Sequence, residues 1–536
     1  MHAVVAARSF ARVLSFVSAC GAVAYAQPGA EWSAADVQHM RGVESGLPPV
    51  TLAAGEPPVA LSLQRLMALY RVPGLSVAVI DGYKVVWAKG YGVTTAGGTT
   101  PVTAHTLFQA GSVSKPVAAA GALALVERGT LSLDEDVNRR LTSWHLPENE
   151  NTRTQKVTLR RILSHTAGLT VHGFAGYAVG TAVPTLPQIL DGEKPANSPA
   201  VRVTAEPGTI WRYSGGGAVL AQQLMIDAGG KPFPSLMREL VFDKLGMTDS
   251  TYEQPLPAER AGAAATGTDA SGKTVPGRWH VYPEMAAGGL WTTPSDLAEF
   301  AIEIALAKHG KSKRIFSSTM AAQMLTPRID VREIALGNEQ HRDRMGLGFF
   351  LGDASRPDLF GHIGDDEGFQ AMLMMYGDSG RGVVVMANSP FGIALGDIVV
   401  ENVAREYGWT YVPPNRPRLG TGAVLRAADE QGLSAALRAY EALKKAHVER
   451  YPTNRDTLIG FAYALLSEGR TQDAIRVLDV EVAEFPDYWN AYDSLGEMYA
   501  VAGKNALAIR NYERSVALNP ENAGGVEALE KLKARH

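Results

Sequence analysis

Residues 108–115 read Phe-Gln-Ala-Gly-Ser-Val-Ser-Lys, and this stretch joins the end of an apolar run to the start of a predicted helix. Pro116 suits a first helical turn, because its missing N–H would be unpaired there in any case. The Ala- and Leu-rich segment 117–128 then predicts a helix that stops at the next glycine. Ser112 and Lys115 are three residues apart, so we expect them on one helical face at the positive end of the helix dipole.

This spacing can supply a nucleophile and its base from a single helix. A serine hydroxyl is a poor nucleophile at neutral pH, but a partly desolvated lysine with a lowered pKa can take its proton. Ser-x-x-Lys is the shortest arrangement that provides both groups. Because the four letters also occur by chance at exposed helix starts, the interpretation depends on whether partner motifs follow in order.

The wider pattern Phe-x-x-Gly-Ser-x-Ser-Lys-Pro resembles the nucleophile motif of the β-lactamase-related serine hydrolases, which include class C β-lactamases, D-peptidases and esterases. The resemblance implies an α+β domain over residues 58–412. Its centre would be a β-lactamase/transpeptidase-like antiparallel sheet, built from both ends of the domain, flanked by helices and carrying a helical insert. The chemistry implied is an acyl-enzyme on Ser112 with no metal and no cofactor.

The second motif is Pro-Gly-Thr-Ile-Trp-Arg-Tyr-Ser-Gly-Gly-Gly at residues 207–217, which precedes a helix expected from Ala218. Tyr213 could be an aromatic staple at this helix start. The resemblance instead implies that Tyr213 acts with Lys115 as general base and acid and relays the serine proton to the leaving group. Gly215 replaces the asparagine of the family's Tyr-x-Asn, which puts the grip on a β-lactam side chain in doubt.

The third motif is Gly-His-Ile-Gly at residues 361–364, where the family carries Lys-Thr-Gly or His-x-Gly. Gly364 would let the substrate approach the strand closely. The resemblance implies that the backbone N–H groups of Asp365 and Ser112 form the oxyanion hole. His362 is then expected to orient the catalytic tyrosine or to polarise the site, although a lone histidine is more often structural.

Two departures from the family pattern bear on the substrate. Ile363 and His362 replace the Thr and Lys that would help to hold a substrate carboxylate. The acidic run 365–367 is either a solvated turn or, if it faces the cleft, a feature that repels carboxylates and favours neutral or cationic substrates. Asp366 is therefore a candidate substrate-binding residue. We expect an esterase, an amidase or a D-amino-acid aminopeptidase, with a β-lactamase or penicillin-binding D,D-peptidase as the alternative.

The remaining patterns of residues 58–412 predict the elements around these motifs. Asp81-Gly82 suits the two-residue turn of a hairpin over residues 75–88. Residues 159–169 read as a helix that ends at Gly168, and His165 within it is expected to be a capping or buried residue rather than the base. Further strands are expected at 349–351, 359–361, 368–376 and 383–388, the third of them opened by the Gly-His-Ile-Gly motif, with a closing helix at 393–407.

The N-terminus has the pattern of an export signal. Arg8 and Arg12 precede a short apolar run that ends Ala24-Tyr25-Ala26, which predicts a signal peptide over residues 1–26. The run is too short for a good membrane span. Cleavage after Ala26 would leave no cysteine and fits a periplasmic or secreted protein. Lipoprotein anchoring at Cys20, the only cysteine, is the alternative, and residues 27–57 read as a lead-in with one short helix.

The C-terminal part repeats with a period of 34 residues and matches the tetratricopeptide pattern. The matching positions are Gly469, Ala474 and Pro486, which recur as Gly503, Ala508 and Pro520. We expect a Pro-rich linker over residues 413–430 and a small all-α tetratricopeptide domain over 431–536. This domain would bind a protein partner, pack on the catalytic domain, self-associate, or simply stabilise the chain.

Composition limits the function classes. The 536 residues carry a net charge of −4, so there is no basic excess that would indicate nucleic-acid binding. The length indicates two or three domains. The expected ligand is a small-molecule or peptide-like acyl substrate. A rival of another class is a non-catalytic protein that senses peptides or β-lactams and binds partners through its repeats, but Ser112, Lys115 and Tyr213 argue for an enzyme.

Overall fold

The computed structural model describes most of the chain. The described residues are 32–50, 59–269, 272–331, 344–409, 433–445, 457–467, 469–520 and 522–534. The signal peptide predicted at 1–26 and the linker predicted at 413–430 lie outside these ranges. No helix among the described residues is both long enough and apolar enough to cross a membrane.

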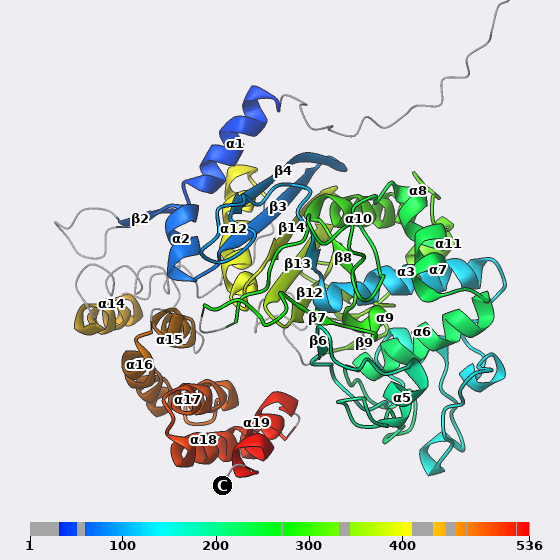
Figure 1. Cartoon of the computed structure of the whole chain (residues 1–536). Coiled ribbons are helices and arrows are strands. Elements are labelled where there is room, and N and C mark those ends of the chain that lie inside the picture. Colours follow the sequence, from blue (N-terminus) through cyan, green and yellow to red (C-terminus); the bar gives the residue numbers. More distant parts are fainter. Residues whose placement is uncertain are drawn as a thin grey trace, which may run out of the picture.

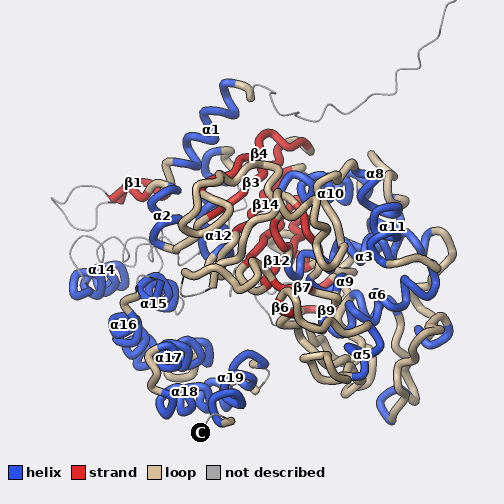
Figure 2. Tube along the Cα trace, in the orientation of Figure 1, coloured by secondary structure: helices blue, strands red, loops and turns tan. Residues whose placement is uncertain are grey.

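An antiparallel sheet of eight strands forms the centre of the larger domain, in the order β4-β3-β14-β13-β12-β11-β10-β9 (Figure 2). Its strands are β3 (Gly74–Asp81), β4 (Lys84–Gly92), β9 (Ile329–Asp330), β10 (Arg344–Met345), β11 (Phe350–Leu351), β12 (Leu359–Asp366), β13 (Phe369–Tyr376) and β14 (Arg381–Ala387). The predicted hairpin is confirmed as β3–β4, but its two turn residues are Gly82 and Tyr83 rather than Asp81 and Gly82, because Asp81 pairs with Lys84. Because β3 pairs with β14, the sheet is built from both ends of the domain, as expected.

Helices cover both faces of this sheet, which explains why its central strands are apolar on both sides. Val384 and Met386 of β14 belong to the core that contains α10 (Pro294–Lys308) and α3 (Ser114–Glu127). Val383 and Val385 point the other way, into the core that contains α12 (Gly392–Glu406). Successive strand residues alternate between faces, so a continuous run of valines fills both cores.

The helical insert lies between the N-terminal hairpin and the C-terminal strands. Its helices are α4 (Leu159–Leu163), α5 (Leu186–Asp191), α6 (Gly215–Gly229), α7 (Phe233–Met237), α8 (Asp243–Leu245), α9 (Met285–Gly288) and α11 (Ser318–Met324). Two short pairs add to it, β5 (Phe108–Gln109) with β8 (Trp291–Thr292) and β6 (Tyr177–Ala178) with β7 (His280–Val281). These elements surround the segment 108–115, whose 3-10 turn contacts β12 and β13 of the sheet.

Three sequence-based boundaries are wrong. The helix predicted over 159–169 ends at Leu163, because His165 takes a left-handed φ of 56° that an α-helix cannot continue. Helix α6 begins at Gly215 rather than Ala218, since the Ser214 side chain caps it by accepting from the Gly217 N–H. The strand predicted to end at residue 361 continues as β12 to Asp366, so the Gly-His-Ile-Gly motif lies inside a strand rather than before one.

Helical segments flank the sheet domain at both ends of the described chain (Figure 1). On the N-terminal side are α1 (Ala34–Glu44), β1 (Leu47–Val50), β2 (Val59–Leu61) and α2 (Leu63–Leu69). On the C-terminal side are α14 (Leu433–Lys445), α15 (Thr457–Ser467), α16 (Thr471–Glu484), α17 (Trp489–Val501), α18 (Asn505–Leu518) and α19 (Ala523–Lys533). The rings of Phe391, just before α12, and Tyr463, in α15, lie 5.9 Å apart, so the C-terminal helices contact the sheet domain.

Candidate active site

Ser112 and Lys115 are brought together at the start of α3. Ser112 lies in a 3-10 turn (Gly111–Val113), and Lys115 lies in the first turn of the α-helix. The Lys115 Nζ donates hydrogen bonds to the Ser112 Oγ at 2.8 Å and to the Ala287 carbonyl oxygen of α9 at 2.8 Å. Lys115 is only 6% exposed. Ser112 and Lys115 are therefore paired as predicted, and α9 also holds the lysine.

Buried contacts fix the backbone around this pair. The Tyr252 hydroxyl donates to the Ser114 carbonyl oxygen at 2.6 Å, and the Leu290 N–H donates to the Ser114 hydroxyl at 3.0 Å. Gly111 has a φ of 50°, and a Cβ there would lie 2.4 Å from the backbone nitrogen of Asp365. Only glycine fits this position, because both the left-handed backbone and the approach of β12 exclude a side chain.

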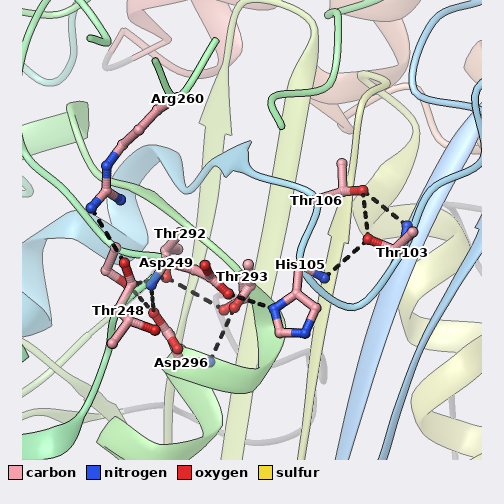
Figure 3. A network of polar contacts seen from close by, with 10 residues as sticks. Thr103, His105, Thr106, Thr248, Asp249, Arg260, Thr292, Thr293 and Asp296 are labelled. Atoms are coloured by element: carbon pink, nitrogen blue, oxygen red, sulfur yellow. Dashed lines mark hydrogen bonds and ion pairs between the residues drawn. The ribbon is translucent and has the colours of Figure 1, made fainter. Parts of the chain in front are cut away.

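The strand that leads into Ser112 is anchored by the polar network in Figure 3. The Thr103 N–H donates to the Thr106 hydroxyl at 2.9 Å, and the His105 Nδ1 lies 2.8 Å from a carboxylate oxygen of Asp249. The Asp249 N–H in turn donates to Asp296 at 3.0 Å, at the start of α10. Burial raises the pKa of Asp296 to about 7. The network ties the segment before β5 to a buried helix start.

Tyr213 lies beside Lys115. The Lys115 Nζ lies 4.9 Å from the centroid of the Tyr213 ring, and the tyrosine is 8% exposed. Its ring is stacked on Phe350 of β11 with 6.2 Å between centroids. The tyrosine of the second motif therefore lies beside the Ser112–Lys115 pair. A tyrosine that only packed against the start of α6 would not need a lysine 4.9 Å from its ring.

His165 supports Tyr213, a role that the sequence did not reveal. The two ring centroids are 4.4 Å apart, and the His165 Nδ1 accepts a hydrogen bond from the Ser214 N–H at 3.2 Å. Burial, and then the charge of Lys115, hold the pKa of His165 well below its usual value, so the ring is neutral. The buried position agrees with the prediction, but the partner lies 48 residues away and no local pattern indicates it.

His362 is a second histidine beside Tyr213. Its Nε2 is 3.5 Å from the Tyr213 hydroxyl, and its Nδ1 contacts the carbonyl oxygen of Ile363. Because a carbonyl oxygen only accepts, Nδ1 carries the proton and Nε2 faces the tyrosine as an acceptor. Burial, and then Lys115, lower the pKa of His362 to about 3, so it is neutral. This geometry agrees with an orienting role.

Strand β12 passes directly beside the 3-10 turn that contains Ser112. A Cβ on Gly364 would lie 1.9 Å from the Ala110 carbonyl oxygen and 2.9 Å from the Ser112 backbone nitrogen. Among the described residues, β11 pairs only with Phe360 and Gly361 of this strand, so the following edge of β12 has no strand partner there. The backbones of Ser112 and Asp365 therefore border the same space. An oxyanion hole requires two N–H donors that border one space in this way.

The space that an asparagine side chain would need at position 215 is filled. The Gly215 N–H donates to the His172 carbonyl oxygen at 2.9 Å, and a Cβ on Gly215 would lie 2.9 Å from that same oxygen. The Phe174 ring would lie 3.1 Å from such a Cβ. The glycine thus allows the segment 172–174 to close over the start of α6, so the departure from Tyr-x-Asn changes the shape of the cleft as well as its chemistry.

A cavity of about 310 Å³ adjoins the end of β12. Its polar lining consists of Asp269, Asp365, Asp366, Glu367 and Tyr282, and Phe174 contributes an apolar wall. The acidic run therefore combines both alternatives: all three residues line the cavity, Asp366 is buried at the end of β12, and Asp365 and Glu367 are exposed, with Glu367 in the turn to β13. Asp366 is only 8% exposed, and burial raises its pKa well above the usual range. Asp365 and Glu367 lie closer to solvent.

A second buried carboxyl group lies behind this cavity. Glu284, which precedes α9, is fully buried and accepts from the Tyr177 hydroxyl at 3.3 Å. Burial raises the pKa of Glu284 to about 7, so this carboxyl group is far more readily protonated than an exposed glutamate. The described part of the chain contains no group of three or more His, Cys, Asp or Glu residues placed to hold a metal ion.

The chain is similar in sequence to known proteins. The profile of the family described as "Beta-lactamase" matches residues 60–405. A "Beta-lactamase" of Pseudomonas fluorescens is 26% identical, over 62% of this chain and 92% of that protein. An "Unguisins hydrolase" of Aspergillus campestris is 30% identical over 49% of each chain, and the relative from Aspergillus violaceofuscus is matched over 42% of its length, so this chain spans less than half of these two relatives.

Among solved structures, the penicillin-binding protein homologue of Pyrococcus abyssi superimposes with a TM-score of 0.54 at 25% identity. The superposition covers 65% of this chain and 77% of the homologue. Its fold agrees with the sheet, flanking helices and insert described above. Since the family profile spans more than half of the 536 residues, this protein belongs to the Beta-lactamase family.

Proposed function

We propose that this protein is a serine hydrolase that cleaves ester or amide bonds through an acyl-enzyme on Ser112. The observation that carries the proposal is the 2.8 Å hydrogen bond between the Lys115 Nζ and the Ser112 Oγ, with Tyr213 beside the lysine. A nucleophile within hydrogen-bond reach of a base, and the base in turn held by other groups, is the arrangement that covalent catalysis requires.

The reaction proceeds in two half-reactions. Ser112 attacks the carbonyl carbon of the substrate while its proton passes to Lys115 or Tyr213, and the tetrahedral oxyanion is bound by the N–H groups of Ser112 and Asp365. Tyr213 then protonates the leaving alcohol or amine as the scissile bond breaks. In the second half, water gives its proton to the same base and attacks the acyl-enzyme, which releases the acid and restores the serine.

Two features favour an ester or amide over a β-lactam. The segment 172–174 occupies the space that an asparagine at position 215 would use, and Ile363 offers no hydroxyl to a substrate carboxylate. The exposed carboxyl groups of Asp365 and Glu367 border the same cleft and would repel that carboxylate. A β-lactamase or D,D-peptidase is the second candidate because of the family and the penicillin-binding homologue, and a sensing protein without turnover is the third.

Export and a partner-binding role of the C-terminal helices are also part of the proposal. Support comes from the signal-like residues 1–26 and from the 34-residue repeat, whose positions fall in α15 to α18 and the turns after them. Periplasmic fractionation of the full-length protein, and retention of a partner by the whole chain but not by one lacking 431–536, would test the two points.

The activity is tested by labelling the mature protein with a fluorophosphonate and measuring its intact mass, with Ser112→Ala as the control. Turnover of a p-nitrophenyl ester and of nitrocefin is then measured on the same samples. The proposal predicts one adduct on the wild type, none on Ser112→Ala, and ester cleavage with little nitrocefin turnover. Faster nitrocefin than ester turnover would favour the second candidate, and the absence of both adduct and turnover would favour the third.

A further inference from the structure

The cavity at the end of β12 has an unusual charge distribution. Asp365, whose N–H belongs to the proposed oxyanion hole, lines it together with Glu367 and Asp269. Four carboxyl groups line it, and none of its described lining residues is Lys or Arg. The aromatic rings of Phe174 and Tyr282 also line the cavity. A cation next to carboxylates and aromatic rings is favoured on both counts.

Asp366 is the buried member of this set. It shares a strand face with His362 and Gly364, because alternate residues of β12 point the same way. One carboxylate oxygen accepts from the Gly111 N–H, whereas the Oδ2 has no hydrogen-bond partner among the described residues. A buried polar atom without a partner is costly, so such atoms commonly await a ligand or water. The cavity that Asp366 lines is where a donor can enter.

We propose that this cavity is a binding subsite for a primary ammonium group of the substrate, with Asp366 as its ion-pair partner and Asp269 and Glu367 at the rim. The inference rests on the proposed function, since the subsite borders the oxyanion hole of the same reaction. When the ammonium group enters, Asp366 releases to solvent the proton that its burial favours, and the ammonium group donates a hydrogen bond to the Oδ2. The positive charge also offsets the repulsion between Asp366 and Asp365.

The test compares substrates that differ only by an ammonium group in place of a methyl group. In the first pair the charge is on the acyl side: alanine p-nitroanilide, in both enantiomers, against isobutyryl p-nitroanilide. In the second pair it is on the leaving side: 4-(aminomethyl)phenyl propionate against 4-ethylphenyl propionate. The ratio of kcat/KM within each pair, divided by the ratio of the hydroxide-catalysed hydrolysis rates of the same two substrates, measures the preference of the site for the cation and cancels the electronic effect of the ammonium group.

The subsite predicts a ratio of about tenfold to a hundredfold in favour of the cation for one pair, the range of one charge-assisted hydrogen bond. Asp366→Asn, which keeps the size and one acceptor, should return this ratio to near one. The rim change Glu367→Gln should reduce it by a smaller factor and serves if Asp366→Asn does not fold. Asp330→Asn, an exposed carboxylate on β9 outside the cavity, removes the same charge and should leave the ratio unchanged.

The outcomes separate the two proposals. Ser112-dependent turnover with a ratio near one in both pairs would overturn the subsite and leave the hydrolase intact. A high ratio that persists in both Asp366→Asn and Glu367→Gln would also overturn it. If no substrate is turned over, the rate of fluorophosphonate labelling is measured with benzylamine present. Slower labelling of the wild type but not of Asp366→Asn supports the subsite, and equal rates contradict it.

Discussion

Replacing Gly364 with alanine is expected to abolish most activity by moving the nucleophile turn away from β12. The added Cβ would lie 1.9 Å from the Ala110 carbonyl oxygen, whereas an ordinary contact begins at 3.4 Å, so the two backbones must separate by about 1.5 Å. Both are backbone atoms, which cannot rotate aside. Misplacement by about 1 Å costs on the order of a hundredfold in rate, so we expect kcat/KM to fall at least that far.

The assay is steady-state hydrolysis of a p-nitrophenyl ester, with circular dichroism melting to show that the variant is folded. Gly396→Ala is the matched control, because a Cβ there lies 3.6 Å from its nearest neighbour inside helix α12. Alanine favours a helix over glycine by about 1 kcal/mol, so this control should keep its activity and melt no lower. A folded Gly364→Ala variant with more than a tenth of wild-type kcat/KM would refute the proposed position of β12.

Three further predictions follow from the same geometry. Tyr213→Phe keeps the ring beside Lys115 but removes the hydroxyl. The kcat for the ester should therefore fall by a factor of about 10²–10⁴, with little change in KM. An unchanged kcat would count against a proton relay through the tyrosine hydroxyl. His165→Leu removes the acceptor for the Ser214 N–H, so kcat should fall about tenfold in a protein that still folds, whereas a loss confined to melting temperature would make His165 purely structural. The pKa of Glu284 is about 7 in the folded protein and about 4.5 in the unfolded chain. Between pH 4.5 and pH 7 the native state therefore binds more protons than the unfolded state. The free energy of unfolding falls by up to about 3 kcal/mol as the pH rises through this range. Urea unfolding of Glu284→Gln at pH 5 and pH 8 should show a smaller loss than the wild type, and equal losses would contradict the shift.

The elements that local sequence controls could be predicted. The Asp-Gly pair predicts the first hairpin to within one residue of its turn, which is Gly82-Tyr83. The Ser112–Lys115 spacing alone puts both side chains on one face, as the 2.8 Å contact confirms. The boundaries that tertiary contacts control could not. The helix after Leu159 stops early because His165 turns back to meet Ser214, and β12 runs on to Asp366 because it pairs with β13 as far as Phe369.

The electrostatic character of the site was also only partly visible in the sequence. The acidic run 365–367 could be read as a turn or as part of the cleft, because strand register decides which side chain points inward. The register of β12 buries Asp366 and leaves Asp365 exposed. Glu284 was missed altogether, since one glutamate before a four-residue helix has no pattern of its own, and only the fold shows that it is buried.

The central claim is that Ser112 carries the acyl group of the substrate during turnover. The most direct measurement is rapid acid quenching of the enzyme within one turnover of a p-nitrophenyl ester, followed by peptide mass mapping. The predicted result is a mass gain equal to the acyl group on the peptide that contains Ser112, with no gain and no turnover in Ser112→Ala. Sustained turnover in Ser112→Ala, or an acyl group found on a different residue, would contradict the claim.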